Sequence, residues 1–203
     1  GQGLQDIECI LRLLDLCIEY KVKKLIFTSS AAVYGDSYPK IEPINPYGIS
    51  KKQCEEWCNY YSQSFGLRIN ILRLANVYGL NGRGVVNKYV DEAKNNEPLT
   101  IYGDGHQVRD YIWVGDIVNI IEKCLTYNYS ITTEVGTGIA SEVWDIINAL
   151  NRRPLTIFHH PYLNKEIRKS VLTPNGLNTF LLNNNFYHFV PLEEGIKKLW
   201  NQK

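Results

Sequence analysis

Tyr47 and Lys51 stand four residues apart in the stretch NPYGISK, directly after a proline that can open a helix. Four residues make about one helical turn, so the phenol and the ammonium would lie on one face. Free tyrosine loses its proton near pH ~10, and a cation within about 4–6 Å favours the phenolate. Such a phenol can exchange protons with a substrate hydroxyl. The alternative is a buried tyrosine beside a solvated lysine, because this spacing also arises by chance.

Two apolar segments of the chain end in polar residues. The segment KLIFTSS ends at Ser30, and the segment RINILRL of residues 68–74 is followed closely by Asn76. Both are typical of buried parallel strands, and ligands bind beyond the carboxyl ends of such strands. Ser30 and Asn76 are therefore predicted to lie at the edge where a substrate would be held. The alternative for Thr28 and Ser30 is that their hydroxyls satisfy backbone groups at the end of the strand.

Five segments of the chain stand in the order found in one known family. They read FTSSAAVYG, PYGISK, LRLANVYG, IYGDG with RDYI shortly after it, and VGTG. On these segments the chain resembles the extended short-chain dehydrogenase/reductase family. Within that family it resembles the NAD-dependent nucleotide-sugar epimerases, of which UDP-glucose 4-epimerase is the best-known member. The resemblance is good over about residues 4–150 and weak in the remainder.

The resemblance implies a set of site residues. Tyr47 would be the catalytic acid/base, Lys51 would bind the nicotinamide ribose, and Ser30 would relay the proton to the sugar. The positions that would line NAD are Tyr47, Lys51, Thr28 and Ala75. The positions that would bind the nucleotide sugar are Ser30, Asn76, Thr100, Tyr102 and Arg109, with Asn76 and Arg109 on the diphosphate and Thr100 and Tyr102 along the base. A guanidinium fork suits phosphate oxygens.

Several of these residues also have structural interpretations. Arg109 could form a salt bridge with Asp110 or Asp116, and Tyr102 could be a core residue at a strand end. Arg73, inside an apolar strand, is interpreted as structural. The histidines His106, His159 and His160 have no acidic partners at metal-ligand spacing, so they are predicted to be surface residues and no metal site is expected.

The chain differs from related enzymes at four informative positions. Ala31 and Ala32 replace the aspartate and glutamate that serve as acid and base in the related 4,6-dehydratases, so that activity is disfavoured. Leu163 stands where a phosphate-binding arginine is usual, and Thr173 stands where an aspartate is usual. These two differences weaken the case for nucleotide-sugar contacts near the C-terminus.

The resemblance implies an enzyme that epimerises a nucleotide sugar through a transient keto-sugar, with NAD as cofactor. A keto-sugar reductase of the same family would share Tyr47, Lys51 and Ser30. A third alternative is an inactive truncated relic or an interaction module. It is supported by the lack of a strand, glycine-rich turn and helix of the kind that binds the NAD pyrophosphate. We therefore expect that the first third of a complete family member is absent, and that this chain alone binds NAD weakly.

The expected fold class is α/β. It comprises the C-terminal part of a Rossmann-type doubly wound parallel sheet and a smaller α/β substrate-binding region. The expected NAD-binding part is residues 1–82 and 114–138, and the expected substrate-binding part is residues 83–113 and 139–203. Asn45 and Gly66 are predicted to cap the helix that follows Pro46, and Ser141 to cap a helix that runs to about Leu150. The expected helices are 4–20, 46–65, 85–95, 115–127, 141–150 and 192–200, and the expected strands are 24–28, 68–74, 99–102 and 132–135.

Composition limits the classes of function. The chain has 203 residues, 44% hydrophobic residues and a net charge of +1. This near-neutral charge gives no electrostatic reason to expect nucleic acid or a membrane surface as a partner. No apolar run approaches a membrane span and no secretory leader is present, so the expected location is cytoplasmic.

The five cysteines are expected to be reduced, although Cys54 and Cys58 have the spacing to share a metal. Family resemblance implies a homodimer formed by the helices at 4–20 and 47–65.

Overall fold

The structure is a computed structural model that describes residues 2–150, 154–161, 167–173 and 188–202. The described residues divide into two compact units. The first unit contains those within 1–74 and 119–135, and the second contains those within 75–118, 136–173 and 185–203. The division by role drawn from the sequence stays a prediction, because compactness does not assign a cofactor or a substrate to either unit.

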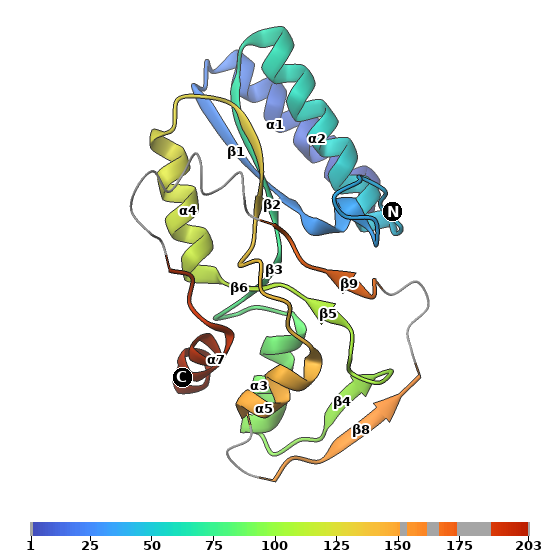
Figure 1. Cartoon of the computed structure of the whole chain (residues 1–203). Coiled ribbons are helices and arrows are strands. Elements are labelled where there is room, and N and C mark those ends of the chain that lie inside the picture. Colours follow the sequence, from blue (N-terminus) through green and yellow to red (C-terminus); the bar gives the residue numbers. More distant parts are fainter. Residues whose placement is uncertain (1, 151–153, 162–166, 174–187, 203) are drawn as a thin grey trace. The chain divides into compact units, whose positions relative to one another are not determined.

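A three-stranded parallel sheet forms the centre of the first unit (Figure 1). Its strands are β1 (Lys24–Ser30), β2 (Arg68–Leu74) and β7 (Ile131–Val135), in the order β1-β2-β7. The register pairs the last residue of each strand with the last residue of its neighbour, so the three carboxyl ends meet at one edge. The predicted α/β fold with parallel strands is confirmed.

Two helices, α1 (Gln2–Glu19) and α2 (Pro46–Phe65), pack against each other in the first unit. The α2 bounds follow from local sequence, as predicted. Asn45 accepts a hydrogen bond from the Gly48 amide at 2.8 Å, Pro46 occupies the first turn, and Gly66 ends the helix in the left-handed region at φ 69°. The core between helices and sheet consists of Ile10, Leu14, Cys17, Cys54, Cys58, Tyr61, Leu67, Ile69 and Ile71.

Among the described residues, three helices and three strand pairs belong wholly to the second unit (Figure 1). The helices α3 (Val85–Lys94), α5 (Val143–Leu150) and α7 (Leu192–Asn201) pack together around an apolar core. The paired strands are β3 (Asn76–Tyr78) with β6 (Tyr111–Trp113), β4 (Leu99–Tyr102) with β8 (Ile157–His160), and β5 (Val108–Arg109) with β9 (Lys169–Ser170). All three pairs are parallel. The division between the units falls within α4 (Val114–Thr126), whose residues from Asn119 onward belong to the first unit.

The prediction that Ser141 caps α5 is wrong. The Ser141 backbone instead forms a two-way bridge with Arg109, in which each amide donates to the other residue's carbonyl oxygen at 2.8 Å. Asp145 does the capping, since its carboxylate accepts the Glu142 amide at 2.7 Å. A serine before an apolar helical run does not reveal that its backbone is committed to a distant strand.

Lys24 stabilises the C-terminal end of α4. Its ammonium donates hydrogen bonds to the carbonyl oxygens of Cys124 at 2.7 Å, Leu125 at 2.8 Å, and Tyr127. A cation placed on the last carbonyls satisfies acceptors that the helix leaves open and interacts favourably with the helix dipole. We expect Lys24→Met to lower the free energy of unfolding by about 1–2 kcal/mol, measured by urea denaturation. Lys23→Met is the matched control at an exposed neighbouring lysine, and an equal loss in both variants would contradict this role.

Four buried tyrosines predict a loss of stability at alkaline pH. Burial raises the pKa values of Tyr34, Tyr78 and Tyr89, and the hydrogen bond to Asp15 raises the pKa of Tyr61 to about 12. An unfolded tyrosine ionises near pH ~10, so the native state keeps these protons where the unfolded state releases them. Their contribution is complete below about pH 10 and is lost as the pH rises through about 12. The urea midpoint should therefore fall steeply over that interval; a constant midpoint would exclude this account.

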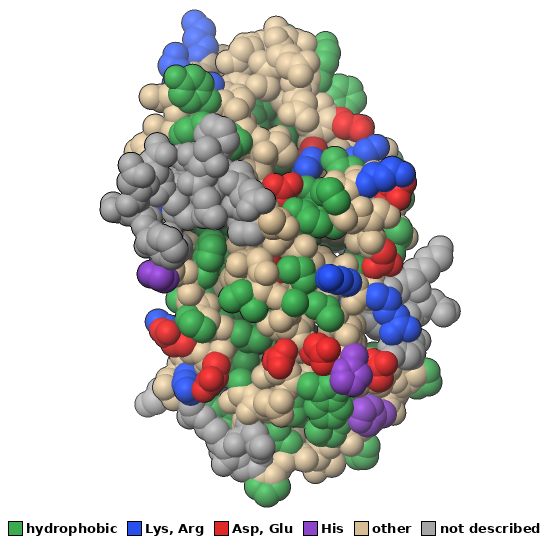
Figure 2. Space-filling model, in the orientation of Figure 1, with side chains coloured by type: hydrophobic (Ala, Val, Ile, Leu, Met, Phe, Trp, Pro, Cys, Tyr) green, Lys and Arg blue, Asp and Glu red, His purple; other side chains and the backbone are tan. Residues whose placement is uncertain are grey.

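On the face shown in Figure 2, acidic and basic side chains are interspersed, in keeping with the net charge of +1. None of the helices within the described ranges is long and apolar enough to cross a bilayer. All five cysteines are free thiols, and the described residues contain no group of three or more potential ligands arranged for a metal ion.

Candidate active site

The first turns of α2 carry Tyr47 and Lys51 at the edge where the parallel strands end. The side chain of Tyr47 is exposed, at 53% of its accessible surface. The Lys51 ammonium lies 5.9 Å from the centroid of the Tyr47 ring and 5.0 Å from that of Phe27. It donates a hydrogen bond to the carbonyl oxygen of Thr28 at 3.0 Å, which fixes the cation to the end of β1. An exposed phenol beside an anchored cation is an arrangement that can exchange a proton with a bound hydroxyl.

Ser30 ends β1 and begins a short 3-10 helix, η1 (Ala31–Tyr34). Its hydroxyl oxygen accepts the Ala32 amide at 3.1 Å, so the structural interpretation of this hydroxyl holds. The hydroxyl remains able to donate, because a serine oxygen that accepts one bond keeps its own proton. The Thr28 side chain is exposed at the same edge, and the Thr28 carbonyl is the one that holds Lys51.

Gly48 allows the start of α2 to approach η1 closely. A Cβ atom at this position would press against the carbonyl oxygen of Ala32 and would lie 3.0 Å from the Ala32 carbonyl carbon and 3.0 Å from Pro43 Cβ. Only a residue without a side chain fits there without displacing backbone. Gly48 therefore keeps the residue beside it, Tyr47, next to the segment that follows Ser30.

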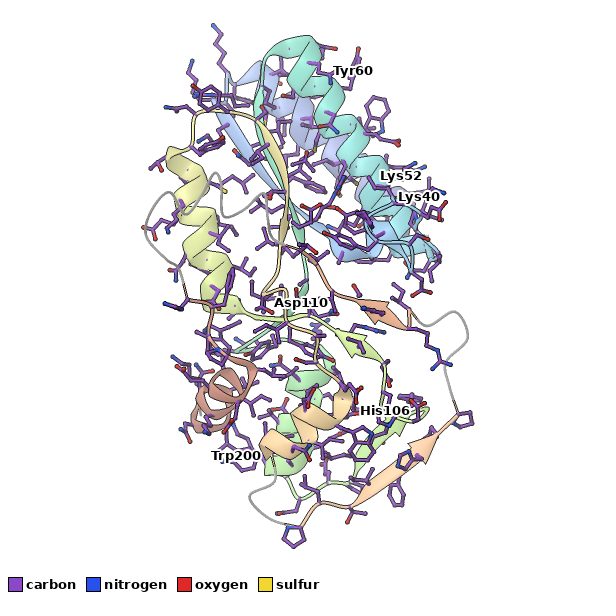
Figure 3. The ribbon with its side chains drawn as sticks, viewed as in Figure 1. Lys40, Lys52, Tyr60, His106, Asp110 and Trp200 are labelled. Atoms are coloured by element: carbon purple, nitrogen blue, oxygen red, sulfur yellow. The ribbon has the colours of Figure 1, made fainter. Side chains whose placement is uncertain are left out.

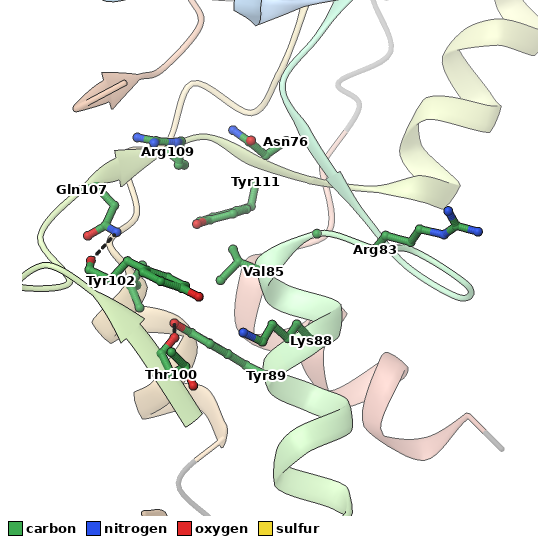
Figure 4. A pocket seen from close by; sticks show the side chains of 12 residues that line it. Asn76, Arg83, Val85, Lys88, Tyr89, Thr100, Tyr102, Gln107, Arg109 and Tyr111 are labelled. Carbon is green, nitrogen blue, oxygen red and sulfur yellow. Dashed lines mark hydrogen bonds between the residues drawn. The ribbon is translucent and has the colours of Figure 1, made fainter. Parts of the chain in front are cut away.

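A pocket of about 360 Å³ lies within the second unit (Figure 4). Asn76, Thr100, Tyr102 and Arg109, the four positions that the resemblance assigns to the nucleotide alone, all line it. Four further aromatic or basic residues were not predicted: Arg83, Lys88, Tyr89 and Tyr111. In Figure 4 the Lys88 side chain points toward Tyr102, and its ammonium is 5.9 Å from that ring centroid. The described lining residues include three cations and no carboxylate, which suits an anionic ligand with a planar ring.

Hydrogen bonds within the second unit fix the pocket wall. Tyr89 donates to the Thr100 carbonyl oxygen at 2.8 Å, and Gln107 donates to that of Tyr102 at 3.1 Å. Arg109 Nη1 donates to the carbonyl oxygens of Val108 at 3.0 Å and Arg168 at 3.3 Å. These contacts hold both ends of the turn between β4 and β5. Lys88 and Tyr89 lie in the first turns of α3. The sequence would have indicated their place at the pocket only if the pairing of the strands were known.

Asp110 ties the β5–β6 connection to the loop after β7 (Figure 3). Its fully buried carboxylate accepts hydrogen bonds from the Thr137 amide at 3.0 Å, the Thr137 hydroxyl at 2.6 Å and the Gly138 amide at 3.0 Å. The glycine-rich stretch 136–138 is thus a loop held by an aspartate.

The other predicted positions have simple surroundings. Ala75 is buried, and Ala31 is buried while Ala32 is partly exposed. Thr173 is exposed, and Leu163 lies outside the described residues. The three histidines are exposed, as predicted; the hydrogen bond to Glu142 at 2.8 Å raises the pKa of His106.

The structure thus groups the predicted residues in two sets. Ser30, Thr28, Tyr47 and Lys51 gather at the sheet edge of the first unit. Asn76, Thr100, Tyr102 and Arg109 gather at the pocket of the second unit. The assignment of catalytic, cofactor and substrate roles to these residues remains a prediction.

The sequence profile of the NAD dependent epimerase/dehydratase family matches residues 4–135. The chain therefore belongs to this family of enzymes. Among curated relatives, an uncharacterized UDP-glucose epimerase of Bacillus subtilis is 33% identical over 165 residues, which are 75% of this chain and 52% of the relative. A putative UDP-glucose 4-epimerase of Methanocaldococcus jannaschii is 34% identical over 153 residues, 68% of this chain and 50% of the relative. The chain spans about half the length of these relatives.

Solved structures agree with this assignment. The structure of UDP-glucose 4-epimerase from Thermotoga maritima with UDP-glucose matches with a TM-score of 0.84 and 30% identity, covering 94% of this chain and 66% of that one. The Thermus thermophilus UDP-glucose 4-epimerase complex with NAD matches with a TM-score of 0.82 and 29% identity, covering 95% and 67%. Both are Rossmann-type epimerases, so the fold class expected from the sequence is confirmed.

Proposed function

We propose that the protein catalyses NAD-dependent epimerisation of a nucleotide-activated sugar through a transient keto-sugar, in the manner of a UDP-sugar 4-epimerase. The observation that carries the proposal is the exposed Tyr47 phenol beside the Lys51 ammonium, which is anchored to the Thr28 carbonyl at the end of a parallel strand. Family membership and the UDP-glucose epimerases among the relatives support it.

Tyr47, Lys51 and Ser30 would move the proton. Acting as the general base, Tyr47 accepts the proton of the sugar hydroxyl, with Ser30 as the relay and the Lys51 ammonium beside the phenol ring. When bound, NAD would supply reversible hydride transfer at the sugar carbon. After the sugar has turned, Tyr47 returns the proton to the keto oxygen, so that the hydroxyl is restored with inverted configuration.

The residues at the sheet edge fit the nicotinamide ribose. A lysine ammonium has three N–H donors, and Lys51 uses one of them on the Thr28 carbonyl. The remaining donors can meet ribose hydroxyls, and the exposed Thr28 side chain can contact the same group. Ala75 is proposed as a further cofactor contact on family resemblance.

The pocket in the second unit would hold the nucleotide. Arg109 and Asn76 are proposed to bind the diphosphate, and Thr100 and Tyr102 to lie along the base. The lining supports this because it joins aromatic rings with cations and has no carboxylate among its described residues.

The proposal is tested by incubating the chain and saturating NAD with UDP-glucose or UDP-galactose and following the anomeric proton signals by NMR. We expect each sugar to convert to the same equilibrium mixture with no net NADH. Consumption of NADPH with a keto-sugar would identify the reductase alternative instead. Binding of UDP-sugar without conversion, at NAD concentrations shown by titration to saturate, would favour the interaction module.

Arg109 should contribute strongly to nucleotide affinity. A guanidinium that binds phosphate oxygens makes charge-assisted hydrogen bonds worth about 1.5–3 kcal/mol, so we expect Arg109→Met to weaken UDP binding by about 10–150-fold. Isothermal titration with UDP measures this, and Arg12→Met on the exposed face of α1 is the matched control. Equal affinities of the Arg109 variant and the native chain for UDP would show that the diphosphate does not bind at Arg109 in this pocket.

A homodimer through α1 and α2 is proposed as well. The two helices expose large apolar side chains, with Leu4 at 74%, Ile49 at 45%, Trp57 at 38% and Tyr60 at 53% of their accessible surface. Trp57 and Tyr60 also line an open groove with Ile7. Light scattering on the native chain and on Trp57→Arg tests this: a monomeric native chain excludes the dimer. Cytoplasmic location stays a prediction from the sequence.

A further inference from the structure

Five buried or half-buried polar residues form a connected network in the first unit. Its members are Ser29, Tyr34, Glu55, Arg73 and Glu134, at the carboxyl ends of all three strands and on α2 and η1. Ser29, Tyr34 and Glu55 are each 3% exposed or less. None of these five residues belongs to the set that the proposed reaction uses.

Arg73 is the centre of this network. Its Nε and Nη2 atoms donate to the two carboxylate oxygens of Glu55, at 3.0 and 2.7 Å. Its Nη1 atom donates to the Tyr34 hydroxyl oxygen at 2.7 Å, and that hydroxyl donates in turn to Glu134. Ser29 donates its hydroxyl to Glu55 at 2.5 Å. Burial raises the pKa of Tyr34, so this phenol stays protonated and keeps its role as donor.

The energetic cost of such a network is high and its net stabilisation is low. Moving one guanidinium and two carboxylates out of water costs several kcal/mol per ion, and well-packed apolar residues of similar volume are often as stabilising or more so. Unlike an apolar core, the charged network fixes the orientation of the groups that it joins. Guanidinium, carboxylate and hydroxyl groups form good hydrogen bonds only within a narrow range of geometry. The network is therefore expected to matter for the position of the segments that it connects.

The network holds the segment that contains Ser30 at both of its ends. Ser29 is tied to Glu55 on α2, and Tyr34 is tied to Arg73 on β2 and to Glu134 on β7. Ser30 and η1 lie between these two attachments. Because the chain is fixed on both sides over six residues, Ser30 has little freedom to move along the sheet edge.

The same carboxylate also sets the position of α2. Glu55 follows Lys51 by one helical turn, so both side chains lie on the face that meets β1. Lys51 donates to the Thr28 carbonyl, and Glu55 accepts from Ser29, the next residue along the strand. These two contacts fix the rotation and the height of α2 against β1, and with them the place of Lys51.

We propose that Tyr34, Glu55, Arg73 and Glu134 are positioning residues that hold Ser30 and Lys51 in the arrangement that proton exchange requires. The inference rests on the proposed function for its catalytic meaning. The four side chains touch no reacting atom; they act through the Ser29–Tyr34 segment and through α2.

Tyr34→Phe tests this with the smallest change, because it removes only the hydroxyl shared by Arg73 and Glu134. Tyr61→Phe is the matched control: Tyr61 also donates to a carboxylate, Asp15, within the same unit, but that bond ties α1 to α2 away from Ser30. Amide NMR of the full chain is the first measurement. In Tyr34→Phe we expect the Ser30 and Ala32 amide signals to shift and the Ala32 amide to exchange about tenfold faster or more, while Tyr61→Phe leaves both unchanged.

Kinetics with NAD and a UDP-sugar are the second measurement. We expect Tyr34→Phe to lower kcat by about 10–100-fold with little change in KM, since a misplaced catalytic group costs turnover rather than binding. If Tyr34→Phe fails to fold, Ser29→Ala takes its place in the experiment. This variant frees the other end of the segment and should give the same kinetic pattern. Equal responses of the Tyr34 and Tyr61 variants, or unchanged Ser30 and Ala32 signals, would overturn the positioning role. Absence of turnover in the native chain would contradict the proposed function alone, and the amide signals would still decide whether the network positions Ser30.

Discussion

Tyr47→Phe should lower the turnover of a nucleotide sugar by about 10²–10⁴-fold, the loss typical of removing a general acid or base. The substitution deletes one oxygen from an exposed side chain, so the fold and the neighbouring Lys51 anchor on Thr28 should persist. Nucleotide affinity should also persist, because the residues that line the proposed nucleotide pocket belong to the second unit and do not include Tyr47. The combination of lost turnover and retained affinity identifies a group used in the chemical step.

Tyr60→Phe is the matched control for this experiment. Tyr60 lies on the same helix and has the same exposed fraction, 53%, but it stands more than three turns further along α2. Steady-state kinetics and UDP titration on both variants separate a catalytic phenol from a general effect of losing a surface hydroxyl. Turnover in Tyr47→Phe that equals turnover in Tyr60→Phe would end the proposed mechanism.

Local signals explain how much of the fold could be predicted. The cap at Asn45, the proline at position 46 and the left-handed Gly66 are all readable from adjacent residues, and α2 begins and ends where they indicate. The apolar run of residues 68–74 likewise places β2, and the short strand predicted at 99–102 is β4. Short strands such as β8 and β9 could not be predicted, because exposed residues form them and only pairing with distant strands makes them regular.

The candidate site shows the same limit. Tyr47, Lys51 and Ser30 were found because motif spacing and resemblance place them, and the structure brings Lys51 beside Tyr47. Lys88, Tyr89 and Tyr111 were missed because their place at the pocket depends on how α3 packs beside β4 and on where β6 lies in the fold. Arg73 was interpreted correctly as structural, yet its partners Glu55 and Tyr34 lie 18 and 39 residues away, and no spacing rule links them.

Arg73→Met should cause the largest loss of stability among single substitutions at the sheet edge. Removing the guanidinium leaves the Glu55 carboxylate buried at 3% exposure without its bidentate partner, and it removes the donor to Tyr34. Breaking a buried ion pair from one side costs about 3–5 kcal/mol, because an uncompensated charge stays in a poorly solvated site. Urea denaturation of the full chain measures this, and Arg12→Met on the exposed surface of α1 should change stability by less than about 0.5 kcal/mol.

The double variant Arg73→Met with Glu55→Met separates two contributions to the free energy of unfolding. One is the cost of leaving the buried Glu55 carboxylate unpaired, and the other is the net contribution of the ion pair. If the loss comes mainly from the uncompensated carboxylate, the double variant should be more stable than Arg73→Met alone, since two apolar side chains can pack where two ions stood. A double variant less stable than the single one would mean that Glu55 supports the fold through Ser29 alone. Recovered stability together with shifted Ser30 and Ala32 amide signals would show that the ion pair positions the residues at the sheet edge and contributes little to the stability of the protein.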